Sequence, residues 1–510
     1  MQREPGLAAS ERAPARAIWA TMVPVTDPIT ALPADPARLD HASARSRVVI
    51  IGGGPGGYEA ALVAARLGAE VTLLEERGIG GAAVLTDVVP SKTLIATAEV
   101  LDMVADSATL GIRDADSATT PAAGSLTVDL DAVNRRVRRL AAAQSADITA
   151  SLTRSGVRIV QARGRLQAPG RVEVVEADGG VAEVLEADVV LLAVGARPRE
   201  LDSARPDGER ILNWTQLYSL TELPSHLIVV GSGVTGAEFA SAYRALGAEV
   251  TLVSSRDQVL PGSDTDAAAV LERAFTRRGV RLKARSRAAA ARREGDGVVV
   301  TLDSGEEIRG SHVLMALGAI PATADLGLEA AGVRLRPSGH IDTDRVSRTS
   351  VRGIYAAGDC TGVHPLASVA AMQGRTAMHH ALGEAVSPLI ASQVSSAIFT
   401  SPEIAAVGCS EQEVNDGLVD AEVRIRPLDL NPRAKMQGFS DGFVKLMVRP
   451  GSHIVAGAVV VAPRASELIL PFALAVTHRL TAEQLAATFT VYPSLTGSVT
   501  EIAREMHGLD

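Results

Sequence analysis

Apolar residues form short continuous runs along the chain, and two of these runs lead into a glycine-rich turn. The run at residues 47–51 enters the glycine-rich stretch 52–57, and a helical pattern at 58–67 and a second run at 70–74 follow. A short, continuously apolar run is typical of a parallel strand that is buried on both faces. The same order returns at residues 227–253. The pattern predicts two strand–turn–helix–strand units, which we interpret as an internal duplication.

Both units carry the spacing G-x-G-x-x-G between strand and helix. The glycines of the first unit are Gly52, Gly54 and Gly57, and Glu75 ends its second strand. Such glycines allow a tight turn and let the backbone approach a pyrophosphate, and an acid about 20 residues further on binds a ribose hydroxyl. We therefore predict a dinucleotide site, with a plain glycine turn as the alternative.

The second unit differs where its second strand ends. Its glycines are Gly231, Gly233 and Gly236. Instead of an acid, the strand ends in Ser254, Ser255 and Arg256. A carboxylate would repel a 2′-phosphate, whereas hydroxyls and an arginine accept one. We expect NADPH at this site, alongside NADH; for Arg256, a solvated loop residue is the alternative.

The rest of the chain adds two kinds of segment. Each unit closes in an apolar strand that ends at a glycine, Gly195 in the first and Gly318 in the second. A later strand brings Asp359 into a glycine-flanked turn, and a helical pattern follows at 366–382. A carboxylate at the carboxyl end of a parallel strand faces the ligand crevice, although taken alone a turn-forming Asp is the commoner interpretation. From about residue 389 the pattern changes to short strands and helices without a nucleotide motif.

The segment 80–92 is unusual for its last residue. It opens with Gly80 and Gly81, runs through small and apolar residues, and ends in Pro-Ser-Lys at Lys92. The 50 basic residues of the chain include four lysines, at 92, 283, 435 and 445. A compact ammonium differs chemically from a planar guanidinium, so we expect Lys92 to hold a place that arginine cannot fill. A solvated residue at a helix start is the alternative.

Composition narrows the classes of function. A chain of 510 residues has room for roughly three domains. Its net charge of −9 argues against a nucleic-acid or anionic-membrane surface, and no apolar run reaches the ~20 residues of a spanning helix. Its cysteines, Cys360 and Cys409, form no C-x-x-C pair, so we expect neither a metal site nor a disulfide framework, and a reducing cytoplasmic setting. Residues 1–45 lack a secretory apolar region, and we expect a disordered extension there.

Together, these motifs over residues 46–507 resemble the flavoprotein disulfide reductase family. The resemblance implies an α/β fold with two Rossmann-like dinucleotide-binding domains and a C-terminal α+β dimerisation domain. It also implies a homodimer with FAD as cofactor and NADPH or NADH as electron donor. The implied domains are an extension at 1–45, an FAD domain at 46–201 and 325–388, an NAD(P)H domain at 202–324, and an interface domain at 389–510.

The resemblance also implies the site residues. Those for FAD are Gly52, Gly54, Gly57, Glu75, Gly80, Gly81, Lys92, Gly195, Asp359, Leu366 and Ala367. Those for NAD(P)H are Gly231, Gly233, Gly236, Glu238, Ser254, Ser255, Arg256 and Gly318. In the family, the Pro-Ser-Lys lysine lies beside flavin N5 and pairs with a Glu, positions that Lys92 and Glu238 hold here. A cation there stabilises negative charge on the reduced cofactor, and its partner keeps the buried charge paired.

The chain departs from the family at the redox centre. The two family cysteines are Ala83 and Val88 here, and the C-terminal His–Glu acid–base pair is Tyr492 and Gly497. No dithiol can form at this site, so the resemblance implies that electrons pass from the flavin directly to a diffusible acceptor. The residue that often covers the flavin as a tyrosine is Val234, which leaves that face more open.

Several segments, among them 78–85 and 141–150, are similar to a quinone-reducing subgroup of the family that lacks the redox cysteines. We therefore expect a quinone acceptor, with Lys92, Glu238 and Tyr492 as the catalytic residues. Tyr492 would come from the partner subunit and line the acceptor pocket, as a hydrogen-bond donor or as plain packing. The alternatives are a pyridine-nucleotide transhydrogenase or other cysteine-less diaphorase, and a non-catalytic flavin-binding module.

Overall fold

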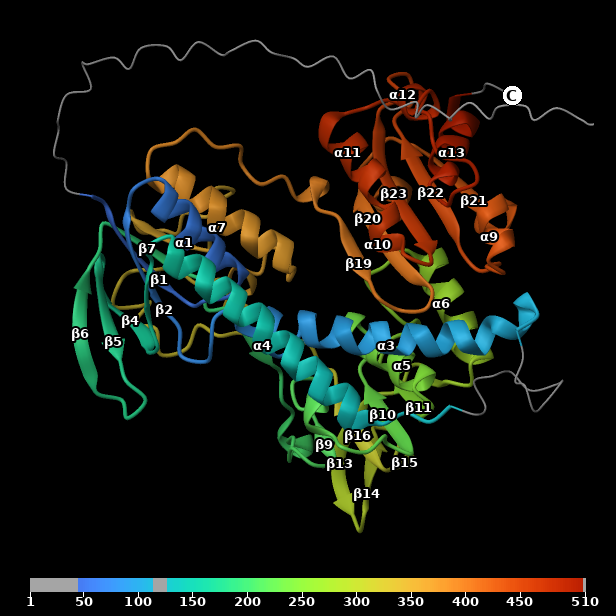
Figure 1. Ribbon diagram of the computed structural model, residues 1–510, viewed down its shortest axis with the longest axis horizontal. Coiled ribbons are helices and arrows are strands. Elements are labelled where there is room, and N and C mark those ends of the chain that lie inside the picture. The colour runs from blue at the N-terminus through green and yellow to red at the C-terminus, as the bar shows by residue number, and fades with distance from the viewer. Residues whose placement is uncertain (1–44, 113–125, 508–510) are drawn as a thin grey trace, which may run out of the picture. The chain divides into compact units, whose positions relative to one another are not determined.

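The computed structural model describes residues 45–112 and 126–507. Apart from residue 45, the expected extension at 1–45 lies outside these ranges. The described part is α/β, with two five-stranded parallel sheets and one five-stranded antiparallel sheet beside smaller ones (Figure 1). The predicted fold class is confirmed. Within the described residues, no helix combines the length and the apolar character needed to cross a membrane.

The first parallel sheet has the strand order β18-β7-β1-β2-β3. Its strands are β1 (Arg47–Ile51), β2 (Glu70–Leu74), β3 (Arg158–Val160), β7 (Val189–Leu192) and β18 (Ile354–Ala356). As the apolar runs predict, β1 and β7 are buried along nearly their whole length. Helix α1 (Pro55–Arg66) packs against α7 (Ala367–Ala381). A Cβ on Gly374 of α7 would lie 2.0 Å from the carbonyl oxygen of Gly56, so this contact requires glycine.

The second parallel sheet repeats this plan in the order β12-β11-β10-β16-β9. Its strands are β9 (Ile211–Leu212), β10 (His226–Val230), β11 (Glu249–Val253), β12 (Arg281–Lys283) and β16 (His312–Met315). Helices α5 (Val234–Ala245) and α6 (Thr265–Arg277) belong to this unit. In both sheets the strand before the glycine motif is central and pairs in parallel with the strand that follows the helix. The predicted internal duplication is thus visible in the topology.

Smaller sheets complete the two units. One contains β4 (Arg163–Ala168), β5 (Arg171–Val175) and β6 (Val181–Glu186), and another β13 (Ala288–Glu294), β14 (Gly297–Leu302) and β15 (Glu307–Gly310). Strand β8 (Ala196–Pro198) pairs antiparallel with β17 (Ala319–Pro321). These two strands follow Gly195 and Gly318, and Gly318 O accepts a hydrogen bond from Arg199 N at 2.9 Å. The two similar strand ends seen in the sequence therefore join the units to each other.

The C-terminal part is built on an antiparallel sheet of order β19-β20-β23-β22-β21. Its strands are β19 (Ser396–Ile398), β20 (Glu403–Gly408), β21 (Glu422–Pro427), β22 (Phe443–Val448) and β23 (Val455–Ala462). Its helices are α8 (Glu411–Asn415), α9 (Pro432–Met436), α10 (Ala465–Leu468), α11 (Leu470–His478), α12 (Ala482–Ala486) and α13 (Gly497–His507). Helices α10 and α11 are separate, because Pro471 lacks the N–H that a continuous helix would use.

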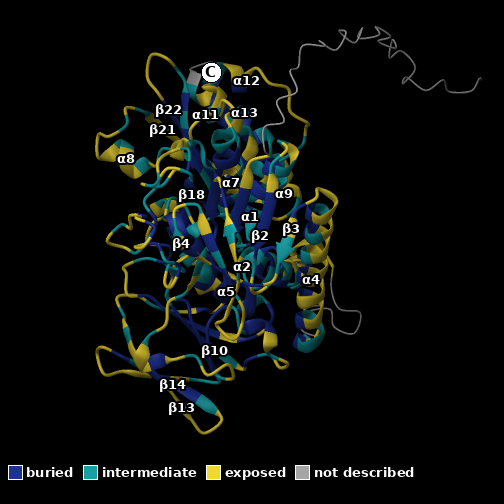
Figure 2. Ribbon diagram, turned by 90° about the vertical axis from the view of Figure 1, so that its left-hand side faces the viewer, coloured by how far each residue is buried: buried dark blue, intermediate teal, exposed yellow. Residues whose placement is uncertain are grey.

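Three further helices lie between β2 and β3 in the sequence. They are α2 (Gly81–Leu85), α3 (Val88–Asp106) and α4 (Leu130–Arg154). Helix α3 packs against α4 and against α5 of the second unit. The outer face of α4 is exposed (Figure 2). Helices α2 and α3 are separated at Thr86 and Asp87, a break that the apolar pattern of this segment does not predict.

Candidate active site

The first glycine loop combines close packing with open space. Gly52 has φ +105°, and a Cβ there would lie 2.3 Å from Ala193 O, while a Cβ on Gly57 would lie 1.9 Å from Gly52 O. No atom lies within 4 Å of the position that a Cβ on Gly54 would take. The outer glycines are therefore needed by the protein itself, and the middle glycine faces space that a ligand can fill.

The second glycine loop has the same construction. A Cβ on Gly231 would lie 2.2 Å from Ala316 O, and one on Gly236 would lie 1.8 Å from Gly231 O. The middle glycine, Gly233, again faces open space. Because both loops share this geometry, both fit a dinucleotide pyrophosphate at the start of the following helix.

Glu75 lies at the carboxyl end of β2, where a ribose-binding acid is expected. Its Oε2 accepts a hydrogen bond from Gly53 N at 2.6 Å, and its Oε1 accepts one from Arg77 N at 2.7 Å. The carboxylate is thus fixed beside the glycine loop. Gly80 and Gly81 reach the same loop: Gly80 N donates to Gly53 O at 2.9 Å, and a Cβ on Gly81 would lie 2.8 Å from the Cα of Gly54.

Lys92 and Glu238, which are 146 residues apart in the sequence, form an ion pair. Lys92 Nζ lies 2.7 Å from Glu238 Oε2, and only 5% of the Glu238 side chain is exposed. The other carboxylate oxygen accepts a hydrogen bond from Phe399 N at 2.9 Å, and Lys92 Nζ lies 4.8 Å from the centre of the Phe399 ring. Helix α3, helix α5 and the segment after β19 therefore meet at one buried charge pair.

Phe399 is a site residue that sequence reasoning missed. It follows a short strand in the C-terminal part, where no nucleotide motif occurs. Only the folded chain brings its backbone N–H to Glu238, and an aromatic ring over an ammonium group adds electrostatic attraction. Nothing in the local sequence indicates this contact.

Asp87 is a second residue that the motifs did not identify. It is partly buried in the break between α2 and α3. Burial raises the pKa of its carboxyl group to about 6; Lys92 lowers this pKa, and Glu238 and Asp359 raise it further. The carboxyl group of Asp87 therefore interacts electrostatically with Lys92, Glu238 and Asp359, which the family resemblance assigns to cofactor binding. An acid within an otherwise small and apolar segment is the one sequence feature that could have indicated it.

Asp359 follows β18 in the turn that the sequence predicts. Gly358 has φ +82°, and its N–H donates to Gln373 Oε1 at 2.8 Å, which fixes the turn. Burial raises the pKa of the Asp359 carboxyl group. Among the described residues, no hydrogen bond reaches the carboxylate of Asp359 or of Asp87. Helix α7 then begins at Ala367, with Leu366 as its N-cap residue.

The three residues at the end of β11 do not act as one group. The Ser254 hydroxyl is buried and lies 2.7 Å from the hydroxyl of Ser232 in the glycine loop. Ser255 and Arg256 are exposed. Ser254 therefore closes the loop, and the exposed pair remains for a 2′-phosphate. Val234 at the start of α5 is 46% exposed, in keeping with the open face expected there.

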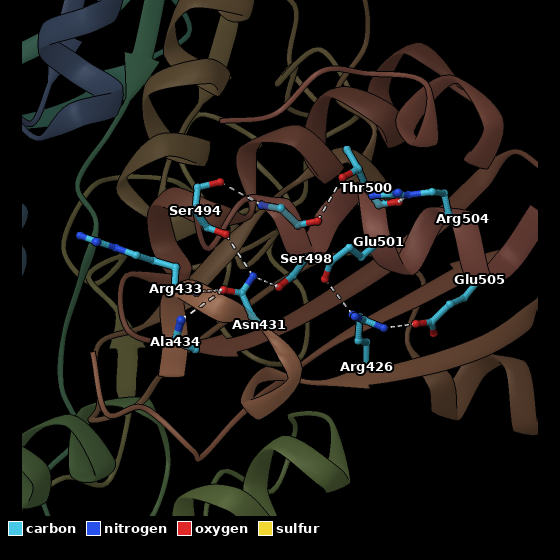
Figure 3. Close-up of polar contacts among 11 residues, drawn as sticks. Arg426, Asn431, Arg433, Ala434, Ser494, Ser498, Thr500, Glu501, Arg504 and Glu505 are labelled. Carbon is cyan, nitrogen blue, oxygen red and sulfur yellow. Dashed lines mark hydrogen bonds and ion pairs between the residues drawn. The ribbon is translucent and has the colours of Figure 1, made fainter. Parts of the chain in front are cut away.

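Tyr492 lies apart from Lys92 within the chain. Its side chain is 78% exposed, and no hydrogen bond or ring contact between described residues joins it to Lys92. The segment that carries it is fastened by Asn431, which is buried and donates to Ser494 O at 3.0 Å and to Ser498 Oγ at 2.8 Å (Figure 3). The contribution of Tyr492 from a partner subunit stays a prediction.

The cysteines are not a redox pair. Cys360 and Cys409 are both free, and burial raises the pKa of the Cys360 thiol to about 12. A buried thiol of this kind is unreactive. Ala83 and Val88, at the positions of the family cysteines, lie in α2 and at the start of α3.

An acidic group lies in the contact between α6 and the C-terminal part. The carboxylates of Asp264, Asp266 and Glu411 are close enough to one another to hold a metal ion. Lys445 already occupies their centre: its Nζ lies 2.6 Å from Asp264 Oδ2 and 2.8 Å from Asp266 Oδ2, and it also contacts Glu411. The cation of this group is therefore a fully buried ammonium.

The arrangement defines a protein that binds two dinucleotides beside a partly buried lysine. Residues 46–374 match the family described as pyridine nucleotide-disulphide oxidoreductase, and residues 394–503 match its dimerisation domain. The chain belongs to the pyridine nucleotide-disulphide oxidoreductase family. It is an oxidoreductase that uses FAD and NAD(P)H, as the residues of both glycine loops fit.

Particular relatives extend this assignment. The NAD(P)H dehydrogenase (quinone) of Mycobacterium tuberculosis is 54% identical over 475 residues, which cover 91% of this chain and 94% of that protein. Dihydrolipoyl dehydrogenase 3 of Pseudomonas aeruginosa is 33% identical over 90% of this chain and 98% of that protein. The crystal structure of LpdA from Mycobacterium tuberculosis has a TM-score of 0.85 at 52% identity, and covers 90% of this chain and 99% of that one. The predicted family is confirmed.

Proposed function

We propose that this chain is an NAD(P)H:quinone oxidoreductase. When bound, FAD takes a hydride from NAD(P)H and returns two electrons to the acceptor. The observation that carries the proposal is the ion pair of Lys92 and Glu238, present beside a segment whose redox cysteines are replaced by Ala83 and Val88. The 54% identical relative named NAD(P)H dehydrogenase (quinone) supports a quinone as the acceptor.

In this proposal the residues of the chain supply charge and position. Lys92 holds a positive charge where negative charge develops on the cofactor, and Glu238 and Phe399 fix its direction. Ala83 and Val88 offer an apolar wall against which a flat acceptor rests. Tyr492 completes the pocket from the partner subunit of a homodimer. The matched dimerisation domain supports the homodimer.

We also propose a role for each of the three domains. We assign FAD binding to residues 46–201 and 325–388, NAD(P)H binding to 202–324, and subunit pairing to 389–510. We also propose a cytoplasmic setting, because the two cysteines are free and far apart in the sequence.

An acceptor screen tests the proposal. The purified holoenzyme should oxidise NADPH with a naphthoquinone and show no turnover with lipoamide, because no dithiol can exchange with the substrate. Turnover with lipoamide and none with the quinone would contradict the proposal. Hydride exchange between NADPH and an NAD⁺ analogue without quinone would favour a transhydrogenase instead.

A further inference from the structure

Asp87 has a fixed place in the site. Its N–H donates to Ala82 O at 2.8 Å, and its carbonyl oxygen accepts from Ser91 N at 2.8 Å. Its backbone angles, φ −132° and ψ −89°, are not helical, so α2 ends before it and α3 begins after it. The helical structure is therefore interrupted shortly before Lys92, and the acidic side chain of Asp87 lies at this interruption.

The charges around Asp87 do not balance. Lys92 is the one cation among the groups that act on its carboxyl group, and Glu238 and Asp359 are further acids. Tyr218, which also faces it, stays neutral, because burial raises the Tyr218 pKa well above its usual value. With all three acids ionised, one positive charge would face three negative ones in a partly dry site. Negative charge added to such a site favours the protonated form of the nearby acids, and so favours uptake of a proton.

Of the three acids, Asp87 is the one best placed to exchange a proton. Both oxygens of Glu238 are held, one by Lys92 and one by Phe399 N. Asp359 lies in the turn assigned to cofactor binding, and Lys92 is not among the groups that shift its pKa. Asp87 has no hydrogen-bond donor on its carboxylate among the described residues and lies in the segment assigned to the acceptor wall. The acid–base pair of related enzymes is absent, since Tyr492 and Gly497 stand in its place.

We propose that Asp87 is the proton donor of the site: it takes up a proton as negative charge appears on the cofactor, and delivers that proton to the acceptor. This role rests on the proposed quinone reductase function. Overall, NAD(P)H, one proton and a quinone give NAD(P)⁺ and a hydroquinone. The hydride broken from the nicotinamide supplies both electrons and one of the two new O–H hydrogens. Asp87 supplies the other hydrogen as a proton and is then reprotonated from water.

The direction of the pH dependence follows from the charges. In the resting site, Asp87 is ionised above about pH 6. Negative charge added nearby disfavours its ionised form and so raises its pKa further. Between about pH 6 and that higher value, reduction of the site is therefore accompanied by uptake of one extra proton.

The test is the midpoint potential of the bound flavin as a function of pH, measured without any quinone. For a two-electron couple, each proton taken up contributes about 30 mV per pH unit. We expect the wild-type holoenzyme to show about 60 mV per pH unit from about pH 6 to about pH 8, and Asp87→Asn to lose about 30 mV per pH unit in that range. Asp106→Asn, an exposed acid at the other end of α3, is the matched control and should keep the wild-type slope.

Kinetics supply a second readout. Asp87→Asn should lower kcat with a quinone by about 100-fold, in the range of a lost general acid, while reduction of the flavin by NADPH is slowed far less.

A wild-type slope of about 30 mV per pH unit throughout, or an unchanged slope in Asp87→Asn, would overturn the role of Asp87 even if quinone is reduced. If the wild type shows the steep slope but does not reduce quinone, the proposed function fails and the proton is delivered to no quinone, which also overturns this role. The wild-type slope remains decisive if the variant does not fold.

Discussion

At the scale of single residues, the chain uses lysine for two charges that lie in partly or fully buried ion pairs. Lys92 pairs with Glu238, and Lys445 is surrounded by three carboxylates. The rarity of lysine indicated Lys92 from the sequence, and the family resemblance indicated Glu238. Phe399 and Asp87 could not be predicted, because a backbone N–H from a distant segment and a field of buried charges exist only in the folded chain.

The role of Lys92 is open to a direct test. Lys92→Met should slow reduction of the flavin by NADPH by about 100-fold, since removing one preorganised electrostatic group costs about 3 kcal/mol in the transition state. Stopped-flow absorbance measures this rate. Lys283→Met removes a lysine from an exposed pair with Glu306 and should leave the rate unchanged.

Lys92→Met leaves the buried Glu238 carboxylate without its partner, which could also destabilise the fold. The double variant Lys92→Met/Glu238→Gln removes both charges and so distinguishes the loss of the positive charge from a loss of stability. The double variant should fold and bind FAD, and should still reduce it slowly. A rate equal to that of the wild type in the single variant would refute the electrostatic role of Lys92.

At the scale of elements, apolar runs and glycine spacing predict the parallel strands and the helices that follow them, because burial on both faces leaves a continuous run in the sequence. The break at Thr86 and Asp87 was missed, since neither residue is the glycine or proline that usually ends a helix. The pairing of β8 with β17 was visible only as a similarity between two strand ends.

Lys445 connects elements that the sequence keeps far apart, since its carboxylate partners lie on α6 and α8. Lys445→Met should lower the free energy of unfolding by about 3 kcal/mol, because it leaves the nearly buried carboxylate of Asp264 without a counter-charge. Urea unfolding measures the loss. Lys435→Met, at an exposed lysine of α9, should change stability by less than about 0.5 kcal/mol. Equal stability of the two variants would show that the buried ammonium contributes nothing.

At the scale of the whole molecule, two copies of one dinucleotide-binding unit and a dimerisation domain carry a redox site at which, in our proposal, the chemistry ends at the flavin. The architecture was predictable because the duplicated motifs span most of the chain. The completed acceptor site was not, because Tyr492 is exposed and makes no contact with Lys92 among the described residues. The family's second redox group is missing, since Ala83 and Val88 cannot form a disulfide.

Direct transfer from the flavin to the acceptor therefore fixes the number of electrons that each subunit can accept. An anaerobic dithionite titration of the holoenzyme, followed by flavin absorbance, counts the electrons that each subunit accepts. A chain with FAD as its one redox group should accept two electrons per subunit, and its spectrum should pass directly from the oxidised to the fully reduced form. Uptake of four electrons per subunit would reveal a second redox pair and would contradict direct transfer from the flavin to the acceptor.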